Sequence, residues 1–142
     1  MKGVVSEPFV LDASIALAWC LRDERTGFTE AILDAVSDGT EVITPAIWPL
    51  ELTNGLLVAE RRRRVSAAQV AVFLDRILRF LISVEPTPAP RAFGDVLSLA
   101  RLQGLTAYDA AYLELASRRA LPLATLDDQL KRAARRVGVP LI

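Results

Sequence analysis

Short apolar runs alternate along this chain with longer segments whose apolar residues recur at helical spacing. The runs 9–11, 41–44 and 121–125 are typical of buried strands, and residues 82–84 begin a further strand candidate. The segments that predict helices are 13–21, 28–36, 47–62, 66–82, 91–102, 107–119 and one that ends at 136. Residues 138–142 are expected to form a loop and an edge strand. This alternation predicts an α/β fold with a central, mostly parallel sheet flanked by helices on both faces.

Glycine, threonine and proline mark where these elements begin and end. Gly39 and Gly104 follow two of the predicted helices, and Thr106 is placed to cap the helix 107–119. The prolines at positions 86, 88 and 90 predict an extended loop, which is too short to separate two domains. A length of 142 residues suits one compact unit, so we expect a single domain spanning 1–142.

The segment 66–82 carries the clearest apolar stripe in the sequence. Its members recur at the spacing of one helix face and are Val70, Phe73, Leu74, Ile77, Leu78 and Leu81. The stripe predicts one long helix through the whole segment.

Four acidic residues stand at junctions between an apolar run and a helix-like segment, namely Asp12, Glu51, Asp109 and Asp127. Acids at such junctions can converge on one crevice of a parallel sheet, where α/β folds bind ligands. Structural explanations exist as well. Asp12 and Asp127 are suited to cap helices, and Asp109 and Asp128 each follow a threonine by three residues, as in a capping box.

Glu51 is harder to explain as a helix cap. Its neighbours are mostly apolar, and burying an unpaired carboxylate is costly. Asn54 lies one turn later on the same helix face, so two side chains offer oxygen atoms there. If several acids share one place, their repulsion raises their pKa values unless a cation neutralises them. An all-oxygen site of this kind suits Mg²⁺ or Mn²⁺.

The composition excludes several kinds of chemistry. The chain has no histidine and one cysteine, Cys20, so it cannot build a Ser-His-Asp triad, a Cys-His pair or the usual zinc site. A lone cysteine agrees with a reducing cytoplasm, which is the location that we expect. The first residues do not resemble a signal peptide, and no apolar run reaches the roughly 18 residues of a membrane span, so we expect no membrane association.

The charges balance, with 17 Lys and Arg against 17 Asp and Glu, so any attraction to nucleic acid must be local. The clearest basic cluster is Arg61, Arg62, Arg63 and Arg64. It is either a solvated helix end that complements the helix dipole or a contact surface for RNA. The apolar content is high, at 52% of residues and a mean hydropathy of +0.32, which predicts apolar surface for a second copy or a partner.

Four motifs in this order resemble those of PIN-domain proteins, and more narrowly those of the VapC toxins of bacterial toxin–antitoxin pairs. They are VLDAS at 10–14, PLELTN at 49–54, LTAYDAAY at 105–112 and LATLD at 123–127. The resemblance covers essentially the whole chain and implies a PIN-like three-layer fold. It also implies a metal-dependent ribonuclease whose Mg²⁺ or Mn²⁺ is held by the acidic quartet Asp12, Glu51, Asp109 and Asp127. Ser14 and Asn54 match supporting polar positions, whereas Asp128 is an extra acid to which we assign no metal.

The same resemblance implies partners. VapC toxins of type II pairs usually form homodimers and are neutralised by a VapB-type antitoxin in a hetero-oligomer. The antitoxin would be expected to dock on the helices of 47–82. Arg61 to Arg64 would then either grip RNA phosphates or meet acids of the antitoxin.

Other classes of protein remain open. A PIN-like binding module without activity and a PIN nuclease of RNA processing would carry similar motifs. An aspartyl-phosphate phosphatase is disfavoured because Ser14 stands where those enzymes usually have a second aspartate. A receiver domain is disfavoured because Asp12 has no adjacent acid.

Overall fold

Residues 5–142, which the computed structural model describes, are built around a parallel sheet of four strands in the order β3-β2-β1-β4. The strands are β1 (Phe9–Leu11), β2 (Val42–Pro45), β3 (Ile82–Glu85) and β4 (Leu123–Ala124). Leu141 forms a single parallel bridge to Leu123, where the sequence predicted an edge strand. The predicted α/β fold with a parallel sheet is confirmed.

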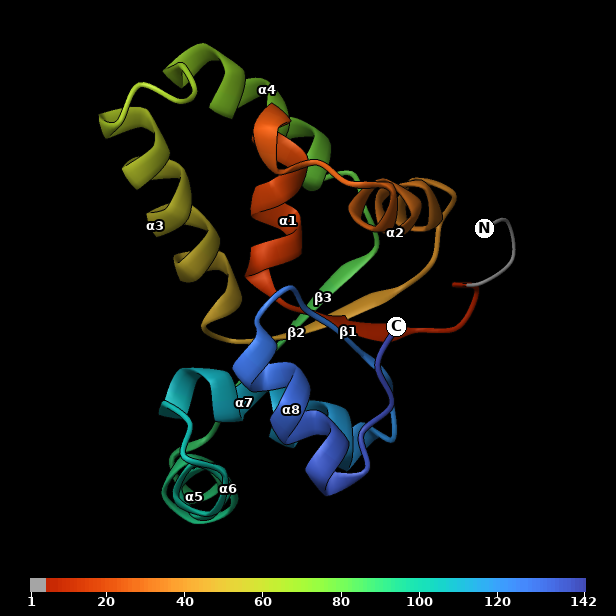
Figure 1. Ribbon diagram of the computed structural model, residues 1–142, viewed down its shortest axis with the longest axis vertical. Helices are drawn as coiled ribbons and strands as arrows, with labels where there is room; N and C mark the ends of the chain where they lie inside the picture. The colour runs from red at the N-terminus through yellow and green to blue at the C-terminus, as the bar shows by residue number, and fades with distance from the viewer. Residues whose placement is uncertain (1–4) are drawn as a thin grey trace.

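Helices cover both faces of this sheet, so the molecule has three layers (Figure 1). On one side lie α1 (Ala13–Cys20), the short turn η1 (Arg22–Glu24), α2 (Gly27–Ser37), α3 (Trp48–Arg61) and α4 (Ala67–Ile77). On the other lie α5 (Ala89–Arg91), the π-helical turn η2 (Ala92–Val96), α6 (Leu97–Gln103), α7 (Ala107–Arg119) and α8 (Asp128–Val137).

The core lies between the central strands and the helices on each side. Every residue of β1, β2 and β4 is buried, whereas Ser83 and Val84 of β3 are exposed because β3 is the edge of the sheet. Helix α7 packs against β1 and β2. Its face toward the sheet includes the small residue Ala110, which has no exposed surface. A small side chain there lets the helix lie close to the strands.

The helix predicted over 66–82 is shorter in the structure, because α4 ends at Ile77. The chain then turns, and Ile82 pairs with Val42 as the first residue of β3. The last two members of the predicted apolar stripe are therefore not in the helix, and Leu78 and Leu81 are 83% and 59% exposed. Their helical spacing was real, but pairing with β2 requires an extended chain from residue 82 onward.

The proline-rich stretch also differs from the prediction. The extended loop ends at Pro88, and Pro90 lies in the first turn of α5, which begins at Ala89. Proline is tolerated there because the first amide groups of a helix have no partner inside the helix. The helical segment predicted for 91–102 thus starts two residues earlier and continues through η2 into α6.

Helix α3 lies close to α1, and this packing sets the direction in which α3 leaves the sheet. A Cβ atom at Gly55 would lie 2.8 Å from Leu17 Cδ2, so a larger residue there would have to displace Leu17. Glu51 is one turn earlier on α3 and is positioned by the same contact. No helix within residues 5–142 is long and apolar enough to span a membrane.

Candidate active site

All four acids of the predicted quartet lie at helix beginnings on the carboxyl side of the sheet. Asp12 precedes α1 and Asp127 precedes α8, while Glu51 and Asp109 lie in the first turns of α3 and α7. Figure 1 shows the beginnings of these four helices gathered beside the ends of β1 and β2. The N-terminal end of a helix carries partial positive charge, which favours a carboxylate at each position.

Asp12 is buried, with 7% of its surface exposed, and two hydroxyl groups hold its carboxylate. Ser14 Oγ donates to Asp12 Oδ2 at 2.6 Å, and Thr125 Oγ1 donates to the same oxygen at 2.7 Å. The Ser14 and Thr125 hydroxyls also accept hydrogen bonds from the amides of Leu126 and Asp127, respectively. The two hydroxyls therefore tie the end of β1 to the loop after β4.

Asp127 has a structural role at the beginning of α8. Its Oδ1 accepts a hydrogen bond from the amide of Leu130 at 2.8 Å. Asp127 therefore caps the helix, as one interpretation of the sequence predicted. The capping box proposed for Thr125 and Asp128 is absent, because the Thr125 hydroxyl is bonded to Asp12 and to the amide of Asp127. Asp127 itself is exposed. Its other oxygen is not needed for capping.

Glu51 is half-buried and bonded to a tyrosine that lies 61 positions away. Tyr112 on α7 donates its hydroxyl to Glu51 Oε1 at 2.5 Å. Asn54, the predicted supporting residue, is exposed on α3. The strong partner of Glu51 in this structure is therefore Tyr112.

Asp109 is placed by the cap of α7. The Thr106 hydroxyl accepts a hydrogen bond from the Asp109 amide at 3.1 Å, as the spacing of these two residues predicted. The Asp109 side chain is half-buried. Its carboxylate does not cap the helix, and the Thr106 hydroxyl lies close enough to it to lower its pKa.

The pKa values of three of these acids are raised. Burial raises the pKa of Asp12, and the charge of Asp127 adds to this while the two hydroxyl bonds oppose it. Burial raises the pKa of Glu51 despite the bond from Tyr112, and the charges of Asp12 and Asp109 contribute. Burial raises the pKa of Asp109, followed by the charges of Asp127 and Asp12. The four carboxylates thus lie close enough for their charges to act on one another.

Mutual repulsion among buried carboxylates is relieved by a cation. Among residues 5–142 no three His, Cys, Asp or Glu side chains lie close enough together to hold a metal ion. The donors are all oxygen atoms from carboxylates and hydroxyls, a set that fits a hard divalent cation such as Mg²⁺ or Mn²⁺. The chemistry of the site therefore favours a cation, and the quartet as its ligands stays a prediction.

The predicted basic cluster divides in the structure. Arg61, Arg62 and Arg63 are exposed at the far end of α3. Arg64 is bonded to the carboxylates of Asp23 and Glu24 in η1, with its shortest contact at 2.6 Å to Glu24. Arg64 thus fastens the α3–α4 corner to η1, and only the first three arginines remain free for a partner.

Two residues of the site escaped sequence reasoning. Thr125 and Tyr112 bond to acids that lie 113 and 61 positions away, so no local pattern predicts these contacts. The sequence does indicate that Tyr112 lies near the acids, because it is one turn after Asp109 on the same face of α7.

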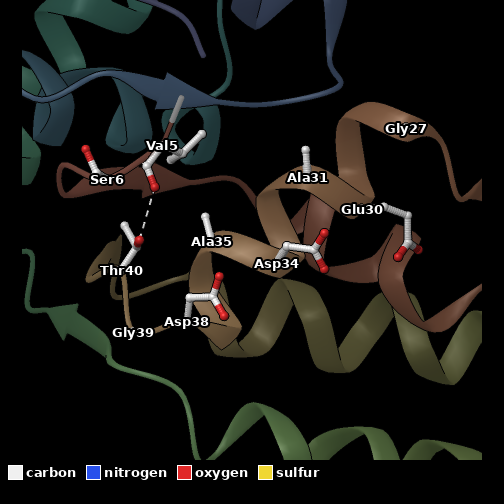
Figure 2. A pocket seen from close by; sticks show the side chains of 10 residues that line it. All are labelled: Val5, Ser6, Gly27, Glu30, Ala31, Asp34, Ala35, Asp38, Gly39 and Thr40. Atoms are coloured by element: carbon white, nitrogen blue, oxygen red, sulfur yellow. Dashed lines mark hydrogen bonds between the residues drawn. The ribbon is translucent and has the colours of Figure 1, made fainter. Parts of the chain in front are cut away.

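A separate hollow of about 780 Å³ lies beside α2 (Figure 2). Its three acids recur every four residues, with Glu30 and Asp34 on α2 and Asp38 at the C-terminal cap of that helix. Thr40 closes one end through a hydrogen bond to the Val5 carbonyl. None of the quartet lines this hollow. Asp34 and Asp38 are exposed, whereas Glu30 is half-buried and paired with Arg25.

The fold and the placement of the acids define an α/β protein of the PIN class. The family model of the PIN domain matches residues 9–136, so the chain belongs to the PIN-domain family. It is 31% identical over 121 residues to Ribonuclease VapC3 of Pyrobaculum aerophilum, an alignment that covers 85% of this chain and 90% of the relative. These findings confirm the resemblance that the four motifs indicated.

Solved structures share the fold at lower identity. PAE2754 of Pyrobaculum aerophilum superposes with a TM-score of 0.70 at 23% identity, over 92% of this chain and 87% of that one. FitAcB of Neisseria gonorrhoeae gives 0.64 at 21% identity, over 94% and 96%. VapBC2 of Rickettsia felis, bound to a DNA fragment from its promoter, gives 0.65 at 16% identity, over 95% and 97%. The architecture is therefore that of the PIN fold over nearly its full length.

Proposed function

We propose that this protein is a metal-dependent endoribonuclease that acts as the toxin of a type II toxin–antitoxin pair. The observation that carries the proposal is the buried Asp12 carboxylate, held by Ser14 and Thr125 and sensing the charge of Asp127. Similarity to a VapC ribonuclease supports the reaction class. We assign Asp12, Glu51, Asp109 and Asp127 to the cation and the attacking water. Such a toxin acts on cellular RNA in the cytoplasm.

The residues of the site have distinct parts in this reaction. A Mg²⁺ or Mn²⁺ held by the four acids would supply a more acidic water and would neutralise charge on the leaving oxygen of the phosphodiester. Ser14 and Thr125 orient Asp12, while Tyr112 holds Glu51. The half-buried Asp109 carboxylate, whose pKa is raised by burial and by the charges of Asp127 and Asp12, is suited to accept a proton from the attacking water.

The partners that we propose are an antitoxin of the VapB type and a second copy of the chain. The similarity to VapBC2 and FitAcB supports the antitoxin. Several large apolar side chains are exposed, among them Val72, Leu78, Phe93 and Leu102, each by more than 70%. Apolar groups of this size on a surface mark interaction sites when they lie together.

The direct test is cleavage of a mixed cellular RNA pool by the purified protein. We expect discrete fragments in Mg²⁺ or Mn²⁺ and intact RNA in excess EDTA. Expression without an antitoxin should also arrest growth, because free toxin would cleave essential RNA. Intact RNA in both metals would instead support a PIN-like binding module, whereas cleavage without growth arrest would support a nuclease of RNA processing.

Arg61 and Arg62 are proposed to contact the RNA backbone. Glu51 and Arg61 are ten positions apart on α3, a rise of about 15 Å, so an RNA strand crossing the site can extend to this end of the helix. The double variant Arg61→Ala/Arg62→Ala should reduce the slope of log affinity against log salt by about 1.4, since each of the two phosphate contacts contributes roughly 0.7 on single strands. Fluorescence anisotropy in EDTA measures binding without cleavage.

Arg79→Ala/Arg101→Ala is the matched control for this measurement. It removes the same charge from two exposed positions, Arg101 on α6 and Arg79 in the turn between α4 and β3, where Arg79 is paired with Asp75. Arg63 is left unchanged because its φ of 57° lies in the left-handed region, so a substitution there would also alter the backbone energy. Equal slopes for the two double variants would refute the RNA contact and leave these arginines to the antitoxin.

A further inference from the structure

Tyr112 is a buried residue whose hydroxyl reaches across the molecule. The side chain lies on α7 with none of its surface exposed. Its bond to Glu51 is the only side-chain hydrogen bond between α3 and α7 within residues 5–142. These helices lie on opposite sides of the sheet (Figure 1). One hydroxyl therefore links a carboxylate on one layer to a helix of the other.

Packing alone does not require this hydroxyl. A phenylalanine would fill the same space, and a buried hydroxyl costs free energy unless it has a partner. The bond length of 2.5 Å is that of a hydroxyl bonded to an ionised carboxylate. Glu51 is thus the partner that satisfies the buried hydroxyl of Tyr112.

The bond also restricts what the Glu51 carboxylate can do. Oε1 accepts the bond from Tyr112, whereas Oε2 has no hydrogen-bond partner within residues 5–142. The charges of Asp12 and Asp109 both act on Glu51, which places this carboxylate beside theirs. Asp109 and Tyr112 lie one turn apart on α7, so the helix that carries one acid also orients another.

Building on the nuclease function proposed above, we propose that Tyr112 is a positioning residue that holds Glu51 Oε1 and presents Oε2 to the cation. Its effect on the reaction passes through Glu51 and not through contact with RNA. The groups that hold a metal-binding carboxylate by hydrogen bonds typically contribute 10- to 100-fold to metal affinity or activity.

The test compares Tyr112→Phe with Tyr108→Phe, which removes a hydroxyl from the same helix at a side chain that is 59% exposed. Mn²⁺ binding is measured by isothermal titration calorimetry, and RNA cleavage is measured as kcat and KM. We expect Tyr112→Phe to weaken Mn²⁺ binding about tenfold and to lower kcat about tenfold, with KM for RNA changed less than about twofold. Tyr108→Phe should behave as the unmodified protein.

A double-mutant cycle separates positioning from packing. Glu51→Asp keeps a carboxylate but shortens it by one methylene, so it cannot hold the Tyr112 hydroxyl in the same place. Adding Tyr112→Phe to Glu51→Asp should then have no further effect on Mn²⁺ binding, because the bond is already lost.

The outcomes distinguish this inference from the function on which it rests. If the unmodified protein binds Mn²⁺ and cleaves RNA while Tyr112→Phe matches Tyr108→Phe, positioning by Tyr112 is refuted and the nuclease stands. Additive effects of Tyr112→Phe and Glu51→Asp would refute it as well, because they indicate a packing role. If the unmodified protein neither binds Mn²⁺ nor cleaves RNA, both proposals fail.

Discussion

Replacing Asp12 by asparagine is expected to abolish RNA cleavage while leaving the metal-free protein at least as stable as the original. Asparagine has nearly the same shape, and its Oδ1 can still accept the hydroxyl bonds of Ser14 and Thr125. The buried negative charge is lost, and burial already disfavours that charge, as the raised pKa of Asp12 indicates. The fold should therefore not suffer.

The cleavage activity of Asp12→Asn should fall even though its stability does not. Groups that only orient a metal-binding carboxylate contribute roughly 10- to 100-fold to activity. Asp12 is proposed to bind the cation itself, so we expect its replacement to lower the cleavage rate by more than about a hundredfold. Cleavage of the RNA pool in Mn²⁺ and a thermal melt in EDTA measure the two effects. Asp128→Asn is the matched control, because Asp128 is exposed in the first turn of α8 beside Asp127. Equal activity of the two variants would refute a catalytic role for Asp12.

Divalent metal is expected to stabilise this protein strongly at neutral pH and only weakly near pH 4. At a metal concentration about 100-fold above the dissociation constant, binding adds about 2.7 kcal/mol to the free energy of unfolding. For a chain of this size that raises the melting temperature by roughly 5 to 10 °C. Protons compete with the metal for the carboxylates, so the shift in Tm should shrink as the pH falls.

Without metal, the acids of the site should make the protein less stable as the pH rises, whereas bound metal stabilises it more at higher pH. The pKa values of Asp12, Glu51 and Asp109 are raised in the folded protein above their values of about 4 in an unfolded chain. Between the unfolded and the folded pKa values the native state binds more protons than the unfolded state. The contribution of these groups to stability therefore falls as the pH rises from about 4 through the folded values.

Melting curves from pH 4 to 8, in EDTA and in Mn²⁺, measure both effects. Asp109→Asn reduces the contribution of the site, because it removes one titrating carboxylate together with one of the charges that raise the pKa of Glu51. We expect the variant to lose less stability than the original as the pH rises in EDTA, and to gain a smaller shift in Mn²⁺. A metal shift that is unchanged by Asp109→Asn would mean that the cation binds elsewhere.

Much of the fold follows from local patterns in the sequence. Helix α7 has the predicted bounds, Ala107–Arg119, because Thr106 caps one end and the helix is long enough for its pattern to dominate. Strands β1 and β2 lie within a residue of the predicted runs, since short apolar runs bounded by turn residues suit strands buried on both faces. Alternation of these elements was sufficient to predict a parallel sheet.

The errors arose where a partner far along the chain decides the local structure. Leu78 and Leu81 continue the helical spacing of α4, but the strand register between Ile82 and Val42 ends the helix at Ile77. Asp128 has the spacing of a capping residue, but its predicted partner Thr125 is bonded to Asp12 instead. In each case a tertiary contact overrides a local preference that is worth only about 1 kcal/mol.

The sequence by itself determined the fold class, the positions of the four acids at helix beginnings and the exclusion of histidine chemistry. These depend on residue type and on spacing within one element, which a single chain displays directly. Only the tertiary structure decided that Ser14 and Thr125 share Asp12, that Tyr112 holds Glu51 and that Arg64 is paired with Asp23 and Glu24. The physical reason is that four of these five pairs join residues 40 or more positions apart, so their contacts exist only after the layers have packed.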